Sequence, residues 1–270
     1  MGGHAAGEIA SQEAVDTVHG MVMRGYDALQ AVAAGDISDS SLRRAIRVVE
    51  SAVQAATYMV FGLAQHDPEQ QGMGTTLSVL AICGRYGITA QVGDSRVYLI
   101  RDHRVSALTE DHTLVAWQLK QGIITAAEAE RSPHRNVITR AVGSREYVQV
   151  DTSFVEISSS DAFLLCSDGL HGYLRDDEIP PVINLGPRAA THRFVELANT
   201  RGGRDNITAI VVQIQYSTGL LHVSSEARLR RSRCGRLRVL SQSQKMRQFH
   251  VREHTSSGTA FAWFAGRRMN

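Results

Sequence analysis

Leu164-Leu165-Cys166-Ser167-Asp168-Gly169 is an apolar run that passes directly into an aspartate and a glycine. Two other stretches have the same design, in which a strand-like run meets an aspartate flanked by glycine or asparagine: Val92-Gly93-Asp94-Ser95-Arg96 and Gly202-Gly203-Arg204-Asp205-Asn206-Ile207-Thr208. Carboxylates at strand ends lie on the rim of a sheet, where loops can gather them. The sequence therefore predicts an acidic cluster of these aspartates at one rim.

Such a cluster needs a cation or a bound proton. Two carboxylates about 4 Å apart repel by roughly 4 kcal/mol at an effective dielectric constant of about 20. Carboxylate oxygens without Cys or His partners suit Mg²⁺ or Mn²⁺ rather than zinc. Each motif alone is more often an ordinary turn, since Gly-Asp and Asp-Gly are common turn dipeptides, so the argument depends on the three together.

The pattern of apolar residues predicts helices that cover a mainly antiparallel sheet system. Helical spacing runs from Ala6 to Val22 and from Leu42 to Leu63, the second run following the candidate caps Ser38 and Asp39. Short β-rich runs separated by turn residues predict strands at Leu77–Ile82, Ile88–Val92, Val97–Ile100, Val148–Val155, Ala162–Cys166 and Ile207–Ile214.

Two further helices have local signals. Thr125 to Glu128 forms a T-x-x-E capping box that opens a short polar helix. A longer helix is predicted from Arg188 to Ala198, ended by Gly202 and Gly203.

Length and composition indicate a globular chain. It has 270 residues, of which 43% are hydrophobic, and no apolar run approaches the roughly 20 residues needed to cross a bilayer. The first thirty residues lack a signal-peptide pattern, so we expect a cytoplasmic protein. The three cysteines, Cys83, Cys166 and Cys234, include no CxxC pair, and we interpret the first two as small buried hydrophobic residues.

Charge divides the chain into two parts. Residues 217–270 contain eleven Lys and Arg against two Asp and Glu, a net charge of +9, and the total of +2 leaves −7 for residues 1–216. Helical or strand periodicity stops after Ile214, which predicts a flexible basic tail at 216–270 beyond a domain at 1–215. Arginine-rich runs can bind nucleic acid or an anionic membrane, but we favour an unstructured, solvated segment because stacking aromatics are not interleaved with the basic residues.

Six motifs in order resemble the metal-dependent protein serine/threonine phosphatases of the PPM, or protein phosphatase 2C-like, family in its bacterial form. The three aspartate motifs are joined by Gly72-Met73-Gly74-Thr75-Thr76, Leu108-Thr109-Glu110-Asp111-His112 and Thr139-Arg140-Ala141-Val142-Gly143. The resemblance covers residues 1 to about 215. It implies an α+β fold, a four-layer α-β-β-α sandwich of two antiparallel sheets flanked by helices, with a mobile flap over residues 115–140.

The resemblance also implies the chemistry. Asp168 and Asp205 match ligands of a pair of Mn²⁺ or Mg²⁺ ions, and Asp94 together with Asp168 matches the site of a third, weaker ion. The implied reaction is hydrolysis of phosphoserine and phosphothreonine by a metal-bound hydroxide, without a covalent phosphoenzyme. The implied partners are phosphorylated proteins and a bacterial serine/threonine kinase with its substrates, and we expect a monomer.

The start of the chain, Met1-Gly2-Gly3-His4-Ala5-Ala6-Gly7-Glu8, looks like the end of the family's Asp-Gly-Met-Gly-Gly-His segment. Early family strands, an acidic pair, an arginine that grips phosphate and an aspartate that bridges two ions would then precede Met1. No proton donor is carried over, so no catalytic residue is assigned. The alternative to an enzyme is therefore a catalytically impaired phosphatase-like module that binds phosphoproteins or regulates a kinase.

Several polar residues near these motifs have a structural interpretation. We expect Arg96 and Arg140 to pack or pair beside the acidic cluster. His112 is interpreted as a structural turn residue, and Glu110 and Asp111 as members of a solvated loop. His4 is a weak candidate for a metal ligand, because a histidine at the start of a helix is usually solvated or capping.

Overall fold

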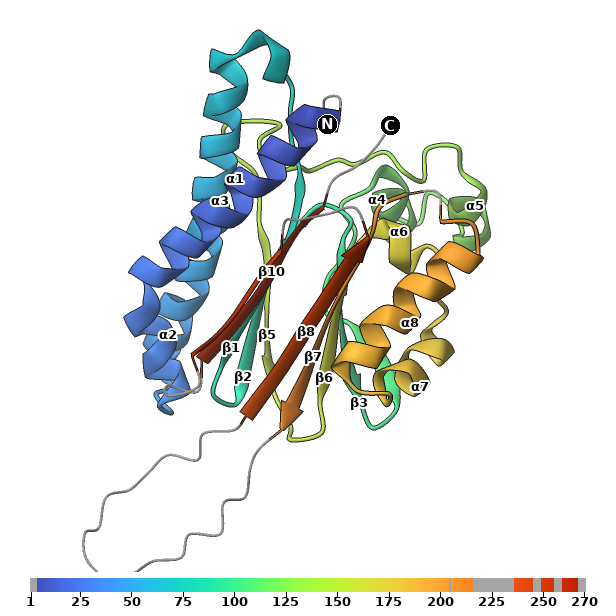
Figure 1. Ribbon diagram of the computed structural model, residues 1–270. Coiled ribbons are helices and arrows are strands. Elements are labelled where there is room, and N and C mark those ends of the chain that lie inside the picture. Colours follow the sequence, from blue (N-terminus) through green and yellow to red (C-terminus); the bar gives the residue numbers. More distant parts are fainter. Residues whose placement is uncertain (1–3, 204, 216–235, 245–248, 255–258, 267–270) are drawn as a thin grey trace, which may run out of the picture.

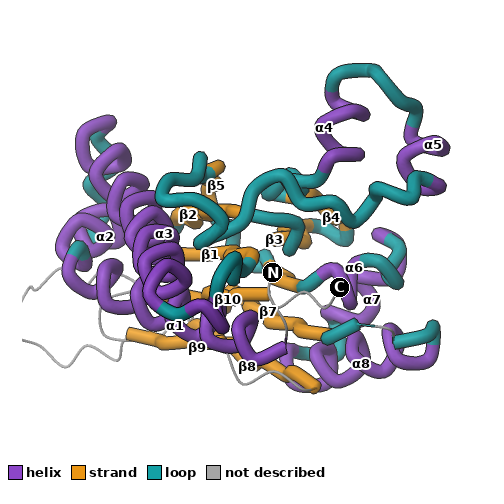
Figure 2. The backbone as a smooth tube through the Cα atoms, turned by 90° about the horizontal axis from the view of Figure 1, so that it is seen from above, coloured by secondary structure: helices purple, strands orange, loops and turns teal. Residues whose placement is uncertain are grey.

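Two five-stranded sheets lie face to face, with helices on both outer faces (Figures 1 and 2). The computed structural model describes residues 4–203, 205–215, 236–244, 249–254 and 259–266. The strand orders are β5-β2-β1-β10-β9 and β4-β3-β6-β7-β8, and every neighbouring pair of strands is antiparallel. This arrangement confirms the predicted four-layer α-β-β-α sandwich.

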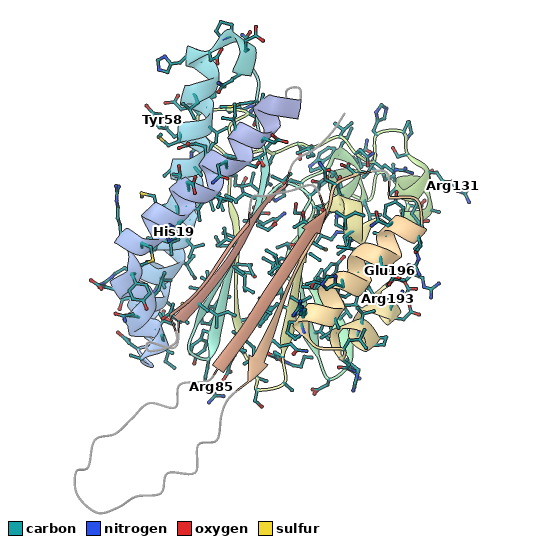
Figure 3. All side chains as sticks on the ribbon, viewed as in Figure 1. His19, Tyr58, Arg85, Arg131, Arg193 and Glu196 are labelled. Carbon is teal, nitrogen blue, oxygen red and sulfur yellow. The ribbon has the colours of Figure 1, made fainter. Side chains whose placement is uncertain are left out.

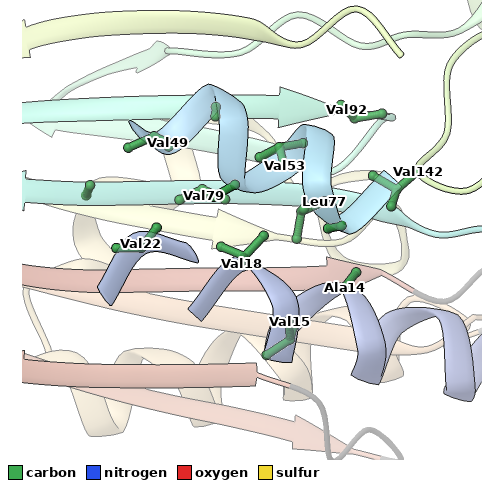
Figure 4. Close-up of a cluster of buried hydrophobic side chains, with 14 of the residues drawn as sticks. Ala14, Val15, Val18, Val22, Val49, Val53, Leu77, Val79, Val92 and Val142 are labelled. Atoms are coloured by element: carbon green, nitrogen blue, oxygen red, sulfur yellow. The ribbon is translucent and has the colours of Figure 1, made fainter. Parts of the chain in front are cut away.

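The first sheet is covered by three helices, α1 (His4–Arg24), α2 (Tyr26–Ala33) and α3 (Asp39–His66). The two long helices confirm the predicted amphipathic runs, and the Oγ of Ser38 caps α3 by accepting the amide of Ser41 at 3.4 Å. Small and β-branched residues on α1 and α3 pack on the outer faces of β1 (Thr76–Cys83) and β2 (Tyr86–Val92) (Figure 4). Short side chains on these faces let the helices lie close to the sheet.

The second sheet is covered by α6 (Asp168–His171), α7 (Ile179–Ile183) and α8 (Pro187–Thr200). Phe194 and Ala198 of α8 are fully buried against β6 (Ala162–Cys166) and β7 (Ile207–Gln215). On the opposite face of α8, Arg193 and Glu196 point away from the sheet and pair with each other (Figure 3). α8 thus confirms the helix predicted over this range, with one apolar and one charged face.

A third apolar cluster fills the space between the two sheets. Leu80 on β1 and Phe163 on β6 are both fully buried in it, together with Ile210 of β7. Ala260 and Ala262 of β10 (Thr259–Gly266) belong to the same cluster. Burial of these apolar side chains holds the two sheets together and fixes the positions of their strand ends relative to one another.

Strands β8 (Arg236–Gln244), β9 (Phe249–His254) and β10 (Thr259–Gly266) lie within the range for which the sequence predicts a flexible tail. β10 pairs with β1 over eight residues, from Thr76 opposite Gly266 to Cys83 opposite Thr259, and β8 pairs with all nine residues of β7. These strands take part in both sheets. The sequence did not predict them, because backbone pairing does not require a periodic apolar pattern along the whole segment. That residues 216–270 form a unit separate from 1–215 stays a prediction.

The remaining elements connect the layers. They are η1 (Pro68–Gln70), β3 (Arg96–Arg101), β4 (Arg104–Ala107), α4 (Leu114–Lys120), α5 (Ala126–Arg131), β5 (Asp151–Glu156) and η2 (Asp176–Glu178). Among the helices of the described ranges, none is both long enough and apolar enough to cross a membrane. Cys83 and Cys166 are free and buried, and loss of solvation raises the pKa of each thiol to about 12, as suits inert core residues. Cys234 lies outside the described residues.

Candidate metal centre

The three predicted aspartates lie at one end of the second sheet. β6 pairs antiparallel with both β3 and β7, so that the end of β6 lies beside the starts of its two neighbours. Asp94 lies in the turn before β3, Asp168 follows β6 as the first residue of α6, and Asp205 precedes β7. Strand pairing therefore gathers segments that are separated by up to 111 positions in the numbering of the chain.

The loops of Asp168 and Asp205 are joined through Ser167. Its Oγ donates to the carbonyl oxygen of Asn206 at 3.0 Å and accepts the amide of Thr208 at 3.1 Å. Its own amide donates to the carbonyl oxygen of Thr208 at 3.2 Å. Because Ser167 and Thr208 are both buried, this small network holds the two aspartate loops at a constant separation.

Both of these aspartates accept a hydrogen bond from the amide of the following residue. The Gly169 amide donates to Oδ1 of Asp168 at 2.9 Å, and the Asn206 amide donates to Oδ1 of Asp205 at 2.7 Å. Each side chain is half-buried, whereas Asp94 is only 6% exposed. The two carboxylates are thus oriented by the backbone at a rim that solvent and ions can reach.

His171 connects the Asp168 helix to the Asp94 turn. Its Nε2 lies 2.9 Å from the backbone carbonyl oxygen of Asp94 and donates to it, because a carbonyl can only accept. Burial, with a smaller contribution from the charge of Arg96, lowers the pKa of His171 to about 4. The ring is therefore neutral at ordinary pH and joins α6 to the Asp94 turn, and no sequence motif pointed to it.

The donor chemistry fits a hard divalent cation, since the three loops present carboxylates and backbone carbonyls and His171 is occupied with a carbonyl. Within the described ranges, however, no three side chains of His, Cys, Asp or Glu converge closely enough to hold an ion. The described parts of the three loops come together without a closed set of protein ligands. Asp94, Asp168 and Asp205 stay predicted ligands.

Arg96 and Asp111 form a bidentate ion pair beside this rim. Its Nε and Nη2 donate to the two carboxylate oxygens of Asp111, each at 2.8 Å, and its Nη1 donates to the hydroxyl of Tyr98 at 3.0 Å. The expected pairing role of Arg96 is confirmed. The expectation of a solvated loop is wrong for Asp111, whose side chain is only 16% exposed because it is held in this pair, and is confirmed for Glu110, which lies on the exposed surface in an ion pair with Lys120.

His112, Asp151 and Arg140 form a second polar group. Nε2 of His112 lies 3.0 Å from Oδ2 of Asp151, and Nη1 of Arg140 donates to Oδ1 of Asp151 at 2.7 Å. Burial alone raises the pKa of Asp151, but hydrogen bonds from His112 and Arg140 outweigh it and lower the pKa below its usual value. The predicted structural roles of His112 and Arg140 are confirmed, because both side chains hydrogen-bond to Asp151. The sequence did not indicate Asp151, which belongs to none of the motifs.

The predicted flap contains two short helices, α4 and α5, on a loop that stands away from the sheets in Figure 2. The capping box is present: Thr125 Oγ1 accepts the amide of Glu128 at 3.3 Å, and Glu128 accepts the amide of Thr125 at 2.7 Å. Trp117 and Ile123 are more than half exposed on this loop. Few apolar contacts therefore hold the middle of the segment to the body.

A cavity of about 410 Å³ opens between α4 and the strands β2 and β5. The sequence predicted no cavity here, although Leu108, Thr109 and Glu110 of one motif line it. Most of its lining is polar. The lining residues are Thr89, Gln91, Leu108, Thr109, Glu110, Lys120, Val150, Asp151, Thr152 and Ser153. Two of them, Gln91 and Asp151, also belong to the polar networks around the Asp94 turn.

Comparison with known proteins gives one consistent result. The family model described as "Protein phosphatase 2C" matches residues 1–210. The protein phosphatase PhpP of Streptococcus pneumoniae is 37% identical over 216 residues, which cover 79% of this chain and 82% of PhpP.

Solved structures agree. The serine/threonine phosphatase PstP/Ppp of Mycobacterium tuberculosis superposes with a TM-score of 0.66 at 33% identity, covering 80% of this chain and 86% of that one. The catalytic domain of PstP in complex with two manganese ions has a TM-score of 0.64 at 32% identity, covering 78% of this chain and 82% of that one.

Proposed function

This chain belongs to the protein phosphatase 2C family, and from that premise we propose that it hydrolyses phosphoserine and phosphothreonine in proteins with the help of Mn²⁺ or Mg²⁺. The observation that supports this most directly is the contact between the Asp168 and Asp205 loops. Ser167 joins them through buried hydrogen bonds, and both loops lie in the segment that matches the family.

Each aspartate has a distinct part in the proposal. Asp168 and Asp205 would hold a pair of ions at the sheet rim, and Asp94 with Asp168 would hold a third, weaker one. When bound, the ions supply activation of a water molecule and neutralisation of the phosphate oxygens. The chain itself orients the carboxylates through the Gly169 and Asn206 amides, and His171 holds the Asp94 turn against α6.

Phosphorylated proteins are the proposed substrates, with a serine/threonine kinase as the opposing enzyme. Two features near the rim fit a protein substrate better than a small molecule. Asp168 and Asp205 are only half-buried, and the neighbouring flap exposes Trp117 and Ile123, which would contact residues on either side of a phosphorylated side chain.

A calorimetric Mn²⁺ titration of the full chain tests the metal ligands. Asp168→Asn and Asp205→Asn should weaken binding most, because each removes an anionic ligand and leaves the turn nearly unchanged, and Asp94→Asn should weaken only a lower-affinity site. Asp177→Asn is the matched control, since Asp177 lies on the surface with its side chain 74% exposed. Equal Mn²⁺ binding by all four variants would contradict the assignment.

Hydrolysis of a phosphothreonine peptide, measured with and without Mn²⁺, tests the reaction. Metal-dependent release of phosphate that falls in the Asp168 and Asp205 variants is the expected result. The alternative, a phosphatase-like module that recognises phosphoproteins without turnover, predicts that the peptide binds to the chain and is recovered still phosphorylated.

A further inference from the structure

We propose that His112 is a positioning residue for the Gly93–Asp94 turn and that it joins this turn to the base of the flap. The inference concerns the organisation of the metal centre, and it rests on the proposed role of Asp94 as a ligand. It is carried by three sets of contacts that meet on this one buried side chain, which is 5% exposed.

First, His112 contacts both backbone polar groups of Gly93, whose carbonyl oxygen also accepts a hydrogen bond from Nε2 of Gln91 at 3.1 Å. The His112 amide donates to the Gly93 carbonyl oxygen at 2.9 Å, and the Gly93 amide donates to Nδ1 of the His112 ring at 3.1 Å. Gly93 has φ +109, and a β-carbon there would lie 2.4 Å from Cγ2 of Thr76. The turn that presents Asp94 is thus pressed against β1 on one side and held by His112 on the other.

Second, Asp151 and Arg140 fix the orientation of the His112 ring. Because Nδ1 accepts the Gly93 amide, the proton of the neutral ring is on Nε2, which donates to Oδ2 of Asp151 at 3.0 Å. Nη1 of Arg140 lies 3.2 Å from the same Nε2, which carries the proton and therefore does not accept from it. Oδ1 of Asp151 accepts from Arg140 at 2.7 Å, so the carboxylate cannot easily rotate away. Asp151 thus fixes the tautomer and orientation of this ring in the way that a carboxylate orients a metal-ligating histidine, although His112 itself binds no ion in the proposal.

Third, His112 is part of the base of the flap. Its carbonyl oxygen accepts the amide of Thr139 at 2.8 Å, and the adjoining residues Thr113 and Ile138 form an isolated antiparallel bridge. The two ends of the segment 113–138 therefore lie side by side, next to His112. A displacement of the flap base has a direct path through this residue to the turn that carries Asp94.

Two substitutions distinguish the two hydrogen bonds of the ring, one with the Gly93 amide and one with Asp151. In His112→Asn, the side-chain oxygen can take the place of Nδ1 and accept the Gly93 amide, but it cannot reach Asp151. In His112→Gln, the side-chain amide can reach Asp151 but leaves the Gly93 amide without its acceptor. Both variants place a neutral amide at the same buried position, so each is the matched control for the other.

Amide hydrogen exchange of the metal-free full chain provides the first measurement. We expect the Gly93 amide to exchange on the order of tenfold faster in His112→Gln than in His112→Asn, which should stay close to the unmodified chain. Equal exchange at Gly93 in both variants would overturn the inference. A purely structural role would lower the melting temperature of both variants without this contrast.

Mn²⁺ titration provides the second measurement, with Asp94→Asn as the reference. The site that Asp94→Asn weakens should lose about tenfold in affinity in His112→Gln and much less in His112→Asn, as for residues behind metal ligands. If Asp94→Asn changes no Mn²⁺ site, the proposed role of Asp94 fails, while the exchange contrast still decides whether His112 holds the turn. If Asp94→Asn weakens a site and His112→Gln does not, the inference fails and the proposed function stands.

Discussion

Gly169 lies so close to Asn206 that a β-carbon at position 169 would be 2.3 Å from the Asn206 carbonyl oxygen. The glycine after Asp168 is therefore required by the neighbouring loop as well as by its own turn. This close approach allows Ser167 to reach the same carbonyl oxygen and links the two aspartate loops.

Gly169→Ala should disturb both stability and metal binding. The added methyl group has to push apart two backbone segments, and overpacking of this kind destabilises a fold by roughly 1–3 kcal/mol. Mn²⁺ affinity should fall as well, because the Asp168 and Asp205 loops separate. Gly20→Ala on α1 is the control, since a β-carbon there meets nothing within 4 Å. Urea unfolding and Mn²⁺ titration check both effects, and a Gly169→Ala protein that behaves like the control would contradict the close contact.

Arg101→Ala should destabilise the fold strongly. Arg101 donates from Nε and Nη2 to the two oxygens of Asp161, at 2.8 and 2.7 Å, and the side chain of Asp161 is 0% exposed. Removing the arginine leaves a buried carboxylate without its charged partner, which costs about 3 kcal/mol or more.

The matched comparison for this pair is Arg43→Ala. Arg43 and Asp39 form an ion pair on the surface of α3, with side chains 67% and 88% exposed, so its loss should change stability by no more than about 0.5 kcal/mol. Chemical denaturation of both variants measures the difference. Similar small effects at the two positions would show that the Arg101 pair is screened by water.

Glu178 should contribute to stability in a pH-dependent way. Hydrogen bonds from Arg201, and then from the Arg175 amide, lower the pKa of Glu178 to about 2. Because the folded-state pKa is depressed, the stabilisation is fully present above the unfolded value of 4.5 and is lost as the pH falls toward 2.

Glu178→Gln should therefore melt at a lower temperature than the unmodified chain at pH 6, and the gap should narrow between pH 4.5 and pH 3. Thermal unfolding followed by circular dichroism at several pH values measures this gap. A difference that does not change with pH would mean that the charge of Glu178 is not what stabilises the contact. The exposed Asp177→Asn is a suitable control.

Removal of residues 216–270 should destabilise the domain, in contrast to what a flexible tail would predict. β1 would lose its eight-residue pairing with β10, β7 would lose β8, and the inner cluster would lose Ala260 and Ala262. With about 1 kcal/mol for each net hydrogen bond, a loss of at least about 3 kcal/mol is expected. Thermal unfolding of a chain ending at residue 215, compared with one ending at 266, tests this. Equal melting temperatures would support the tail interpretation.

Sequence periodicity predicted the elements that are amphipathic by themselves. α1 and α3 could be predicted because apolar residues recur on one face of each, and α5 because Thr125 and Glu128 cap each other within one turn. The three aspartate motifs could be found because each combines a buried strand with a turn residue next to it in the chain. In all of these, the deciding interactions join residues that are near one another in the sequence.

The C-terminal strands and the support of the Asp94 turn depended on distant contacts. β10 is defined by pairing with β1, some 180 positions earlier, and its short apolar run has no apolar–polar alternation that would mark one face of a sheet. Asp151 looks like any strand residue until it is found 3.0 Å from His112, which lies 39 positions away. By itself, the sequence determined the helices with an apolar face, the strand-to-aspartate turns and their order. Only the tertiary structure decided which backbone edges pair and which buried polar groups meet, because those free energies arise between segments that the chain brings together only on folding.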